Sequence, residues 1–226
     1  MSRQASYQDR RTVLGKAHLI EPIVRHRIHE SLFYKQYLHL TNEATLMTVV
    51  DQQVQYVGGA DGIGKPCPFL CCLLRMLELE PLSEMIDVYL NQLGYNLFKY
   101  LTAMALLYVR LTYSSDKVYT ILDTFYTDFR KLRFLLKIPV YTATGSACHY
   151  KLSYIDELVD ELICRERVCD IILPRITPRQ RLVEQDQVAP RIYNIITKGE
   201  NRYSKSEEYD NANDSDDKSD FMSDSD

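Results

Sequence analysis

The sequence predicts an all-α fold, arranged as a single compact domain of about seven to nine helices. Apolar residues recur at spacings of three and four along most of the chain, which places them on one face of successive helices. Glycine and proline residues separate these periodic segments, as expected of connections between helices. The 226 residues are 46% hydrophobic and 11% aromatic, a composition that supports a buried core and excludes a wholly disordered chain.

Two helices are expected in the first part of the domain. Over residues 18–32 one face carries Ile20, Ile23, Val24, Ile28 and Leu32. Pro22 fits the first turn of this helix, where its missing N–H costs nothing. Thr41 and Asn42 are both good N-caps for the second helix, which we expect to continue until Gly58-Gly59 stops it.

The centre of the chain contains the most apolar segments. Residues 69–77 form one apolar run, and Ser83 is placed to cap the helix that follows it. Residues 97–112 are apolar nearly all round, which predicts a central buried helix. A long amphipathic helix is expected over residues 116–137, with a basic far end that the helix dipole favours.

The helical periodicity breaks after this segment. Gly145 and its β-favouring neighbours predict a loop with one short hairpin near residues 138–152. Ser153 and Asp156 have nearly the spacing of a capping box and open a further helix whose carboxylates face outward. A final short turn is expected over residues 168–173.

Composition divides the chain into three regions. We expect a flexible arm over residues 1–16, the helical domain over 17–195 and a disordered Ser/Asp-rich tail over 196–226. Residues 200–226 carry ten acids and three bases, a net charge of −7, and the rest of the chain carries +3. A nearly neutral body is not the strongly basic surface of a free-standing nucleic-acid binder.

The sharpest chemical motif is a glycine loop. Gly59-x-x-x-x-Gly64-Lys65 matches a phosphate-binding loop except at its last position, where Pro66 replaces the Ser or Thr that would bind magnesium. Proline supplies neither a hydroxyl nor an N–H group. We therefore interpret the loop as a shaped connector between helices, and nucleotide binding as the weaker alternative.

No other residues form a recognisable reactive centre. Cys67 and Cys71 have a spacing that zinc tolerates, but Cys71 lies among leucines, where cysteine behaves as a small buried hydrophobe. Arg110 ends a strongly apolar helix, so we expect a carboxylate or carbonyl partner for its charge. The sequence thus predicts no catalytic residues, no cofactor and no metal, and favours an interaction module over an enzyme.

A resemblance to a known family rests on several segments that occur in order between about residue 17 and residue 193. They are Arg25-x-Arg-Ile-x-Glu-Ser31, Tyr56-Val-Gly-Gly59, Lys65-Pro-x-Pro-Phe-Leu70, the run 98–112, Ile155-Asp-Glu-Leu-Val-Asp-Glu-Leu162 and Glu166-Arg-Val-Cys-Asp-Ile-Ile-Leu-Pro-Arg175. Together they resemble the pre-mRNA-splicing factor thirty-eight family. The last run is long enough to be specific.

The resemblance implies a non-catalytic nuclear protein with an all-helical domain that acts as a scaffold in the spliceosome. It implies a place in or beside the tri-snRNP and a requirement at activation, when U-four small nuclear RNA is released from U-six. It also implies two kinds of partner, one like microfibrillar-associated protein one and one a zinc-finger splicing protein. Many animal members add an Arg/Ser-rich tail, which this chain replaces with a short Ser/Asp tail.

Two segments are the candidate partner-binding surfaces. In the loop 56–68 we select Tyr56, Gly58, Gly59 and Lys65, because glycines allow a close backbone approach. In the turn 165–170 we select Arg165, Glu166, Arg167 and Asp170, whose charges can make directional hydrogen bonds. The alternative for both segments is intramolecular, with glycines shaping a connector and charges pairing locally.

Two further sets of residues carry hypotheses. Arg130, Lys131, Arg133 and Lys137, at the basic end of the helix expected over 116–137, are the candidate RNA contacts, for which we expect weak and salt-dependent binding. Ser223 and Ser225 each precede an aspartate and are candidate phosphorylation sites for an acid-directed kinase.

Overall fold

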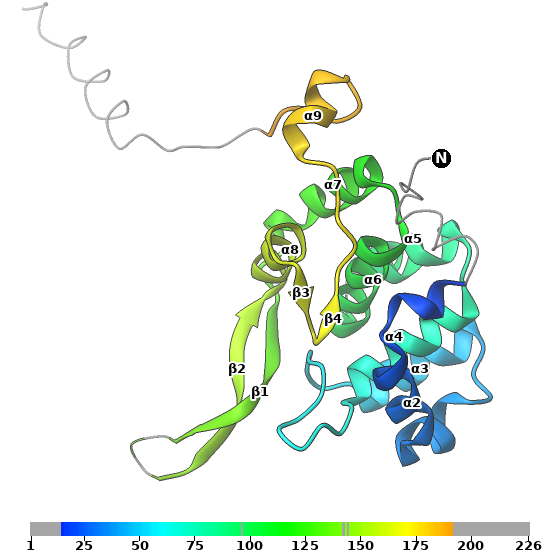
Figure 1. Cartoon of the computed structure of the whole chain (residues 1–226), viewed down its shortest axis with the longest axis vertical. Coiled ribbons are helices and arrows are strands. Elements are labelled where there is room, and N and C mark those ends of the chain that lie inside the picture. Colours follow the sequence, from blue (N-terminus) through cyan, green and yellow to red (C-terminus); the bar gives the residue numbers. More distant parts are fainter. Residues whose placement is uncertain (1–14, 96, 142, 144, 192–226) are drawn as a thin grey trace, which may run out of the picture. The chain divides into compact units, whose positions relative to one another are not determined.

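Helices make up most of the described elements (Figure 1). The computed structural model describes residues 15–95, 97–141, 143 and 145–191. The described residues up to Ala189 belong to one compact unit, and the chain from Pro190 onward belongs to a second. In chain order, the helical elements of the described residues are η1 (Lys16–Leu19), α2 (Pro22–Glu30), η2 (Tyr34–Leu38, a π-helical segment), α3 (Glu43–Gln53), α4 (Pro68–Leu79), α5 (Ser83–Asn91), η3 (Gln92–Gly94), α6 (Lys99–Thr112), α7 (Ser115–Thr124), η4 (Phe125–Thr127), α8 (Ile155–Cys164) and α9 (Arg179–Glu184).

The predicted all-α fold class is wrong, because the domain also contains strands. Those in the described ranges are β1 (Lys131–Tyr141), β2 (Ala147–Tyr154), β3 (Arg167–Val168) and β4 (Ile171–Ile172). They form two small antiparallel sheets, β1 with β2 and β3 with β4. The fold is therefore largely helical with one long hairpin and one short hairpin.

The first helices follow the sequence signals at their starts more closely than at their ends. Pro22 occupies the first turn of α2, as predicted. Asn42 caps α3 and accepts a hydrogen bond of 2.8 Å from the N–H of Thr45, also as predicted. However, α3 ends at Gln53 rather than at Gly58-Gly59, because Val57 pairs with β1 instead.

The central core lies around α4 and α6. Every residue of α6 from Leu101 to Leu111 is buried, which confirms the central buried helix. Near its end, the Nε of Arg110 donates a hydrogen bond of 2.7 Å to the carbonyl oxygen of Leu162 in α8. This contact confirms the expected carbonyl partner for a buried guanidinium. The helix predicted to begin at Ser83 is α5, with Leu82 rather than Ser83 at its N-cap.

The helix predicted over residues 116–137 is wrong in its second half. α7 ends at Thr124, and β1 begins at Lys131. Phe129, which has the spacing of the apolar stripe of that predicted helix, is 67% exposed. The apolar spacing here fits a strand as well as a helix, and the cross-strand ladder from Lys131 to Tyr141 supplies the backbone partners.

The hairpin expected near residues 138–152 is present, but it is longer than predicted. Its register begins with Lys131 opposite Tyr154 and ends with Tyr141 opposite Ala147, with an irregularity between Leu135 and Val140. Ser153 is the buried end of β2, and its hydroxyl hydrogen-bonds to the Glu157 carboxylate. The predicted capping box at Ser153 is therefore wrong, and Tyr154 is the N-cap of α8.

The short turn expected over residues 168–173 is the β3–β4 hairpin. Val168 lies opposite Ile171, and the two residues between them have positive φ, 51° at Cys169 and 63° at Asp170. Positive φ at both central residues is typical of the type I′ turn, whose twist matches that of the strands it joins.

Several predictions concern residues outside the described ranges. They are most of the arm over 1–16, of which Gly15 and Lys16 are described, and all of the tail over 196–226 with Ser223 and Ser225. Within the described ranges, no helix has both the length and the apolar character needed to cross a membrane.

Candidate functional site

The loop 56–68 and the turn 165–170, 110 residues apart in the chain at Ala60 and Asp170, meet beside β1. Residues of both segments line one cavity of about 230 Å³ together with part of β1 and with Lys151 of β2. Among the candidate partner-binding residues, those that line this cavity are Gly58, Gly59, Arg165, Arg167 and Asp170, and the candidate RNA contact Lys137 lines it as well. Tyr56, Lys65 and Glu166 lie outside its lining. We call this cavity the clasp pocket.

The loop approaches β1 as a short third strand. The N–H of Val57 donates to the carbonyl of Arg133, and the N–H of Leu135 donates to the carbonyl of Val57, each at 2.8 Å. A Cβ at the adjacent Gly58 would lie 2.7 Å from the Cβ of Leu135. Glycine at this position is therefore required for the close backbone approach.

Asp170 fastens the turn to both the loop and the hairpin. Its Oδ2 accepts a hydrogen bond of 2.9 Å from the N–H of Ala60, and its Oδ1 lies 2.6 Å from the Nζ of Lys137 in β1. Burial alone would raise the pKa of Asp170, but the bonds from Lys137 and Ala60 hold it below the ordinary value of 3.8. A Cβ at Gly59 would lie 2.3 Å from the same Oδ2, so a larger residue has no space there.

The tip of the glycine loop is folded around an aspartate. The Oδ1 of Asp61 accepts hydrogen bonds from the N–H of Ile63, at 2.9 Å, and from the N–H of Lys65, at 2.8 Å. In a phosphate-binding loop, such N–H groups face the anion instead. A carboxylate of this chain already occupies that position, which favours the interpretation of the loop as a connector.

The charges at the rim of the clasp pocket make local ion pairs. Arg165 lies 3.2 Å from Glu161 of α8, and Arg167 lies 2.7 Å from Glu21, which precedes α2. Both guanidinium groups remain more than half exposed. Ion pairs as exposed as these exchange readily with other partners, because water screens them. In the free protein these charges therefore pair within the chain, as the alternative interpretation expected. Their exposure still allows them to contact a partner.

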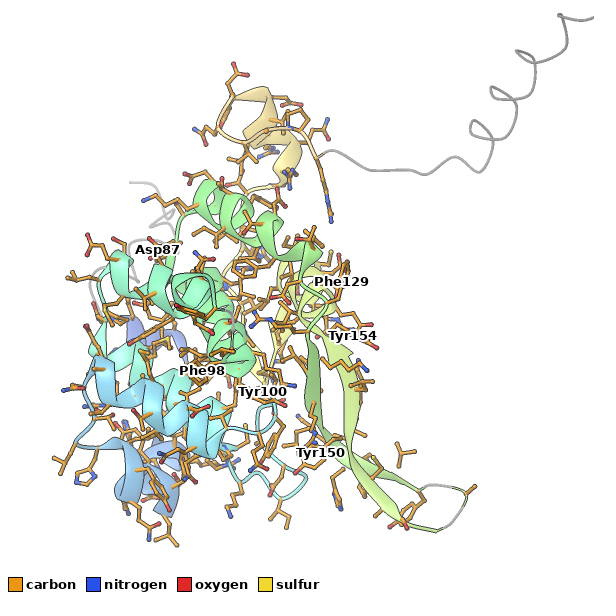
Figure 2. All side chains as sticks on the ribbon, turned by 180° about the vertical axis from the view of Figure 1, so that it is seen from behind. Asp87, Phe98, Tyr100, Phe129, Tyr150 and Tyr154 are labelled. Carbon is orange, nitrogen blue, oxygen red and sulfur yellow. The ribbon has the colours of Figure 1, made fainter. Side chains whose placement is uncertain are left out.

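Sequence reasoning missed the aromatic contact beside the loop. The rings of Tyr56 and Tyr150 lie 5.0 Å apart, and Figure 2 shows Tyr150 on the hairpin. Burial raises the pKa of Tyr56 to about 12, so its hydroxyl stays protonated at neutral pH. A correct hairpin register would have revealed this contact, because it fixes which β2 residues share the face of Leu135.

The candidate RNA contacts do not form one helical patch. Arg130 pairs with Asp128 at 2.6 Å and also donates to the hydroxyl of Thr102, and Lys137 pairs with Asp170. Lys131 and Arg133 are exposed on β1. The structure thus divides the set into two cations that face solvent and two that make intramolecular ion pairs.

A second cavity lies beside these exposed cations. It has a volume of about 370 Å³, and its lining includes Arg133, Lys99 and the apolar side chains of Leu97 and Phe98. Figure 2 shows Phe98 and Tyr100 at the start of α6, where this cavity opens. Burial, and then the like charges of Arg133 and Arg130, lower the pKa of Lys99. We call this cavity the basic pocket.

The cysteines show no arrangement suited to metal binding. In the ranges that the structure describes, no group of three or more His, Cys, Asp or Glu side chains is placed to hold a metal ion. Cys67 is buried, and its thiol donates to the carbonyl of Gly58 at 3.0 Å. Burial raises the pKa of Cys67 to about 12 and that of Cys71 to about 11, so both thiols are neutral and have a packing role.

A helical core that carries an exposed hairpin and open, charge-rimmed pockets is typical of a binding module. Residues 10–186 match the PRP38 family. The chain belongs to this family.

Relatives and a solved structure support the assignment. The chain is 37% identical over 179 residues to pre-mRNA-splicing factor 38A of *Xenopus tropicalis* and of *Homo sapiens*, with 77% of this chain and 52% of each relative covered. It is 36% identical over 177 residues to pre-mRNA-splicing factor 38 of *Drosophila melanogaster*, with 77% of this chain and 49% of that protein covered. The chain thus spans about half the length of the curated relatives it matches.

The fold also matches a chain of the crystal structure of the Snu23-Prp38-MFAP1(217-258) complex of *Chaetomium thermophilum*. The TM-score is 0.71 at 38% sequence identity, and the match covers 80% of this chain and 88% of that chain.

Proposed function

We propose that this protein is a non-catalytic scaffold of the spliceosome that acts in pre-mRNA splicing through protein–protein contacts. The observation that carries the proposal is the match over residues 10–186 to the PRP38 family, together with the shared fold of a chain in a complex that contains Snu23 and MFAP1. The open, charge-rimmed pockets support a binding role. We expect no turnover of any small molecule by the purified chain.

The proposed partners are a protein like MFAP1 and a zinc-finger splicing protein like Snu23. We place one docking surface at the clasp pocket, because its rim presents Arg165 and Arg167 to solvent beside an apolar floor that includes Leu135. Exposed arginines at such a rim can make directional, charge-assisted bonds to a partner's carboxylates. The glycines at 58 and 59 allow the loop to lie directly against Leu135 and Asp170.

A binding experiment tests the docking surface. The full chain is titrated by calorimetry with a segment of the MFAP1-like protein from its own organism. This segment corresponds to residues 217–258 of the Chaetomium thermophilum protein. Changing both Arg165 and Arg167 to Glu should weaken binding by about tenfold or more, because it replaces two attractive charges with two repulsive ones. Arg175→Glu, a charge reversal at another exposed arginine, is the matched control and should leave the affinity within about twofold. Equal affinities for the double variant and the wild type would refute this placement of the surface.

We further propose that the protein resides in the nucleus, joins with the tri-snRNP at the precatalytic stage and is required when U-four RNA is released from U-six. Depletion from a splicing extract should stall complexes that retain U-four, and adding back the recombinant chain should restore its release. Normal release of U-four after complete depletion would contradict this role while leaving the scaffold proposal to the binding experiment.

RNA contact at the basic pocket is the second candidate function. The observation that favours it is the group of like charges at Lys99 and Arg133, with Lys131 exposed on the same strand. Phosphate would relieve this repulsion, so changing Lys131 and Arg133 to Glu should reduce crosslinking to RNA in assembled complexes several-fold. Lys35→Glu, at an exposed position on η2, is the control. Unchanged crosslinking in the double variant would exclude the basic pocket.

Phosphorylation of the tail is a separate proposal. Ser223 and Ser225 each precede an aspartate, and phosphate at both would make a strongly acidic tail more acidic still. Mass spectrometry of the native protein tests it, and a tail found only in its unmodified form would contradict it.

A further inference from the structure

Strand β2 presents a free edge. Among the described residues, β2 pairs only with β1. Figures 1 and 2, seen from opposite sides, both place β1 between β2 and the helices that follow the loop 56–68, so that the far side of β2 faces outward. A strand edge of this kind carries unpaired N–H and C=O groups and is a template for pairing with another chain.

The hydrogen bonds of Val57 identify which backbone groups face outward. Val57 bonds to the C=O of Arg133 and the N–H of Leu135 on the side of β1 away from β2. In an antiparallel ladder, the residue directly opposite such a position also turns its backbone groups away from the ladder. Leu152 lies opposite Arg133, and Tyr150 lies opposite Leu135. The N–H and C=O groups of Tyr150 and Leu152 therefore point to the free edge.

These groups lie beside exposed apolar side chains. Leu152 is 57% exposed and Tyr150 is 39% exposed, and both lie on the same face of β2 because side chains alternate along a strand. The thiol of Cys148 donates to the carbonyl of Tyr150 at 3.1 Å, and a thiol is a weak donor that an amide can replace. Protected edges usually carry proline or charged side chains, especially lysine; β2 has no proline, and its one lysine is Lys151.

The opposite face of β2 is acidic. A cavity of about 400 Å³ is lined by Lys151 of β2, Arg165, Tyr126 and four carboxylates from α8, which are Asp156, Glu157, Asp160 and Glu161. The Nζ of Lys151 lies 6.0 Å from the centre of the Phe134 ring in β1, so this cation leans away from the free edge. Oδ1 of Asp156 is buried and has no hydrogen-bond partner in the described part of the chain. We call this cavity the acidic pocket.

We propose that the free edge of β2 binds an extended peptide of a partner protein, whose side chains alternate between apolar and basic. The peptide adds as a third strand and pairs with the backbone groups of Tyr150 and Leu152. Its apolar side chains cover Leu152, and its basic side chains enter the acidic pocket on the other face, because successive side chains of a strand point to opposite faces. This site goes beyond the proposed function, because it requires neither of the two proposed partners and is centred on the edge of β2. The acidic pocket shares Lys151, Glu161 and Arg165 with the clasp pocket, whereas Asp156 and Asp160 line only the acidic pocket.

A synthetic peptide provides the probe. A fluorescently labelled nonapeptide that alternates valine and lysine is titrated with the full chain and followed by anisotropy. It should bind at least about tenfold more tightly than the alternating valine and glutamate peptide, because only the former complements the acidic pocket. Equal binding of the two peptides would overturn the proposal.

Two variants separate the contribution of backbone hydrogen bonds to peptide binding from the contribution of charge. Leu152→Pro removes an outward N–H without removing a donor from the β1–β2 ladder, and it should weaken binding of the valine–lysine peptide by about tenfold. Leu152→Val, which retains the N–H, should stay within about twofold. Changing Asp156 and Asp160 to Lys should also weaken binding by about tenfold and should reduce its salt dependence.

The Asp156→Lys, Asp160→Lys variant keeps the proposal testable if Leu152→Pro disturbs the hairpin. Lysine is a good helix former, so these two substitutions preserve α8. Unchanged affinity in the Asp156→Lys, Asp160→Lys variant would overturn the proposal. Sedimentation of the chain without peptide tests the alternative, in which a second copy of this chain binds the edge of β2. A dimer that dissociates in Leu152→Pro would show that the edge binds a second copy of this chain, and would also overturn the proposal.

Discussion

Helix α6 and the β1–β2 hairpin use similar apolar residues in opposite ways. Every residue of α6 from Leu101 to Leu111 is buried, with helices packed on all sides. Among the described hairpin residues only Leu132 and Ser153 are buried, and apolar side chains such as Ile138 remain in contact with solvent. The comparison shows that α6 stabilises the domain through its buried contacts, whereas the hairpin packs against the domain at a few residues and exposes most of its surface.

The two regions are stabilised by different interactions. α6 depends on close packing, in which each lost methyl group leaves a cavity. In the hairpin, Leu132 joins the core and Phe134 and Leu135 pack against it. Directional bonds add to this packing, namely those of Val57 to β1 and those of Asp170 to Lys137 and Ala60. Substitutions should therefore have large effects in α6, intermediate effects at the Asp170 contacts and small effects at the hairpin surface.

The largest effect is expected in α6. Leu106 is fully buried, so Leu106→Ala should lower the free energy of unfolding by about 2–5 kcal/mol through lost burial and the cavity left behind. Denaturant titration followed by circular dichroism measures the change. Leu152→Ala, the same substitution on the hairpin, should cost less than about 1 kcal/mol, and similar losses for both variants would contradict the comparison.

Gly59→Ala should have the next largest effect. The new Cβ would lie 2.3 Å from Oδ2 of Asp170 and 2.7 Å from the carbonyl oxygen of Cys169, so the loop and the turn must separate. We expect a loss of about 1–3 kcal/mol in the free energy of unfolding, measured by denaturant titration. Ile63→Ala at the exposed tip of the same loop is the control and should change the stability by less than about 0.5 kcal/mol.

The contacts of Asp170 should also depend on pH. Because the pKa of Asp170 is lowered on folding, its contribution to stability is present above the ordinary value of 3.8 and is lost as the pH falls through the lower folded value. Asp170→Asn should remove about 1 kcal/mol at neutral pH and flatten the stability profile below pH 3.8. Amide exchange at Ala60 should become faster in this variant.

The matched control for this prediction is Asp87→Asn, which changes an exposed carboxylate on α5. It should leave both the neutral stability and the exchange rate at Ala60 unchanged. If Asp170→Asn also left amide exchange at Ala60 unchanged, Asp170 would not be the residue that fastens the turn to the loop.

The smallest effect is expected on the hairpin surface. Ile138 is 80% exposed, so Ile138→Ser should change the free energy of unfolding by less than about 0.5 kcal/mol. Thermal denaturation is sufficient to measure this. A loss comparable to that of Gly59→Ala would mean that Ile138 is packed, and that the hairpin is not the exposed surface described above.

Much of the helical part of the fold follows from local signals. Pro22, Asn42 and the apolar run over 97–112 each predict an element that the structure contains. The hairpin could not be predicted in this way beyond a short piece, because the apolar spacing of 116–137 suits a helix and the partner strand lies further along the chain. The two candidate segments at 56–68 and 165–170 were identified, but their meeting at one pocket was not.

The sequence alone was sufficient to predict the central buried helix, the starts of α2 and α3, the glycines that permit close approach and the resemblance to the splicing-factor family. The tertiary structure was needed to show that residues 131–141 pair with residues 147–154, that Arg130 pairs with Asp128, and that no other described strand pairs with the outer edge of β2. The physical reason is the distance along the sequence over which each interaction acts. Caps and helical periodicity act within a few residues, whereas strand pairing and ion pairs between distant segments depend on which segments the folded chain brings together.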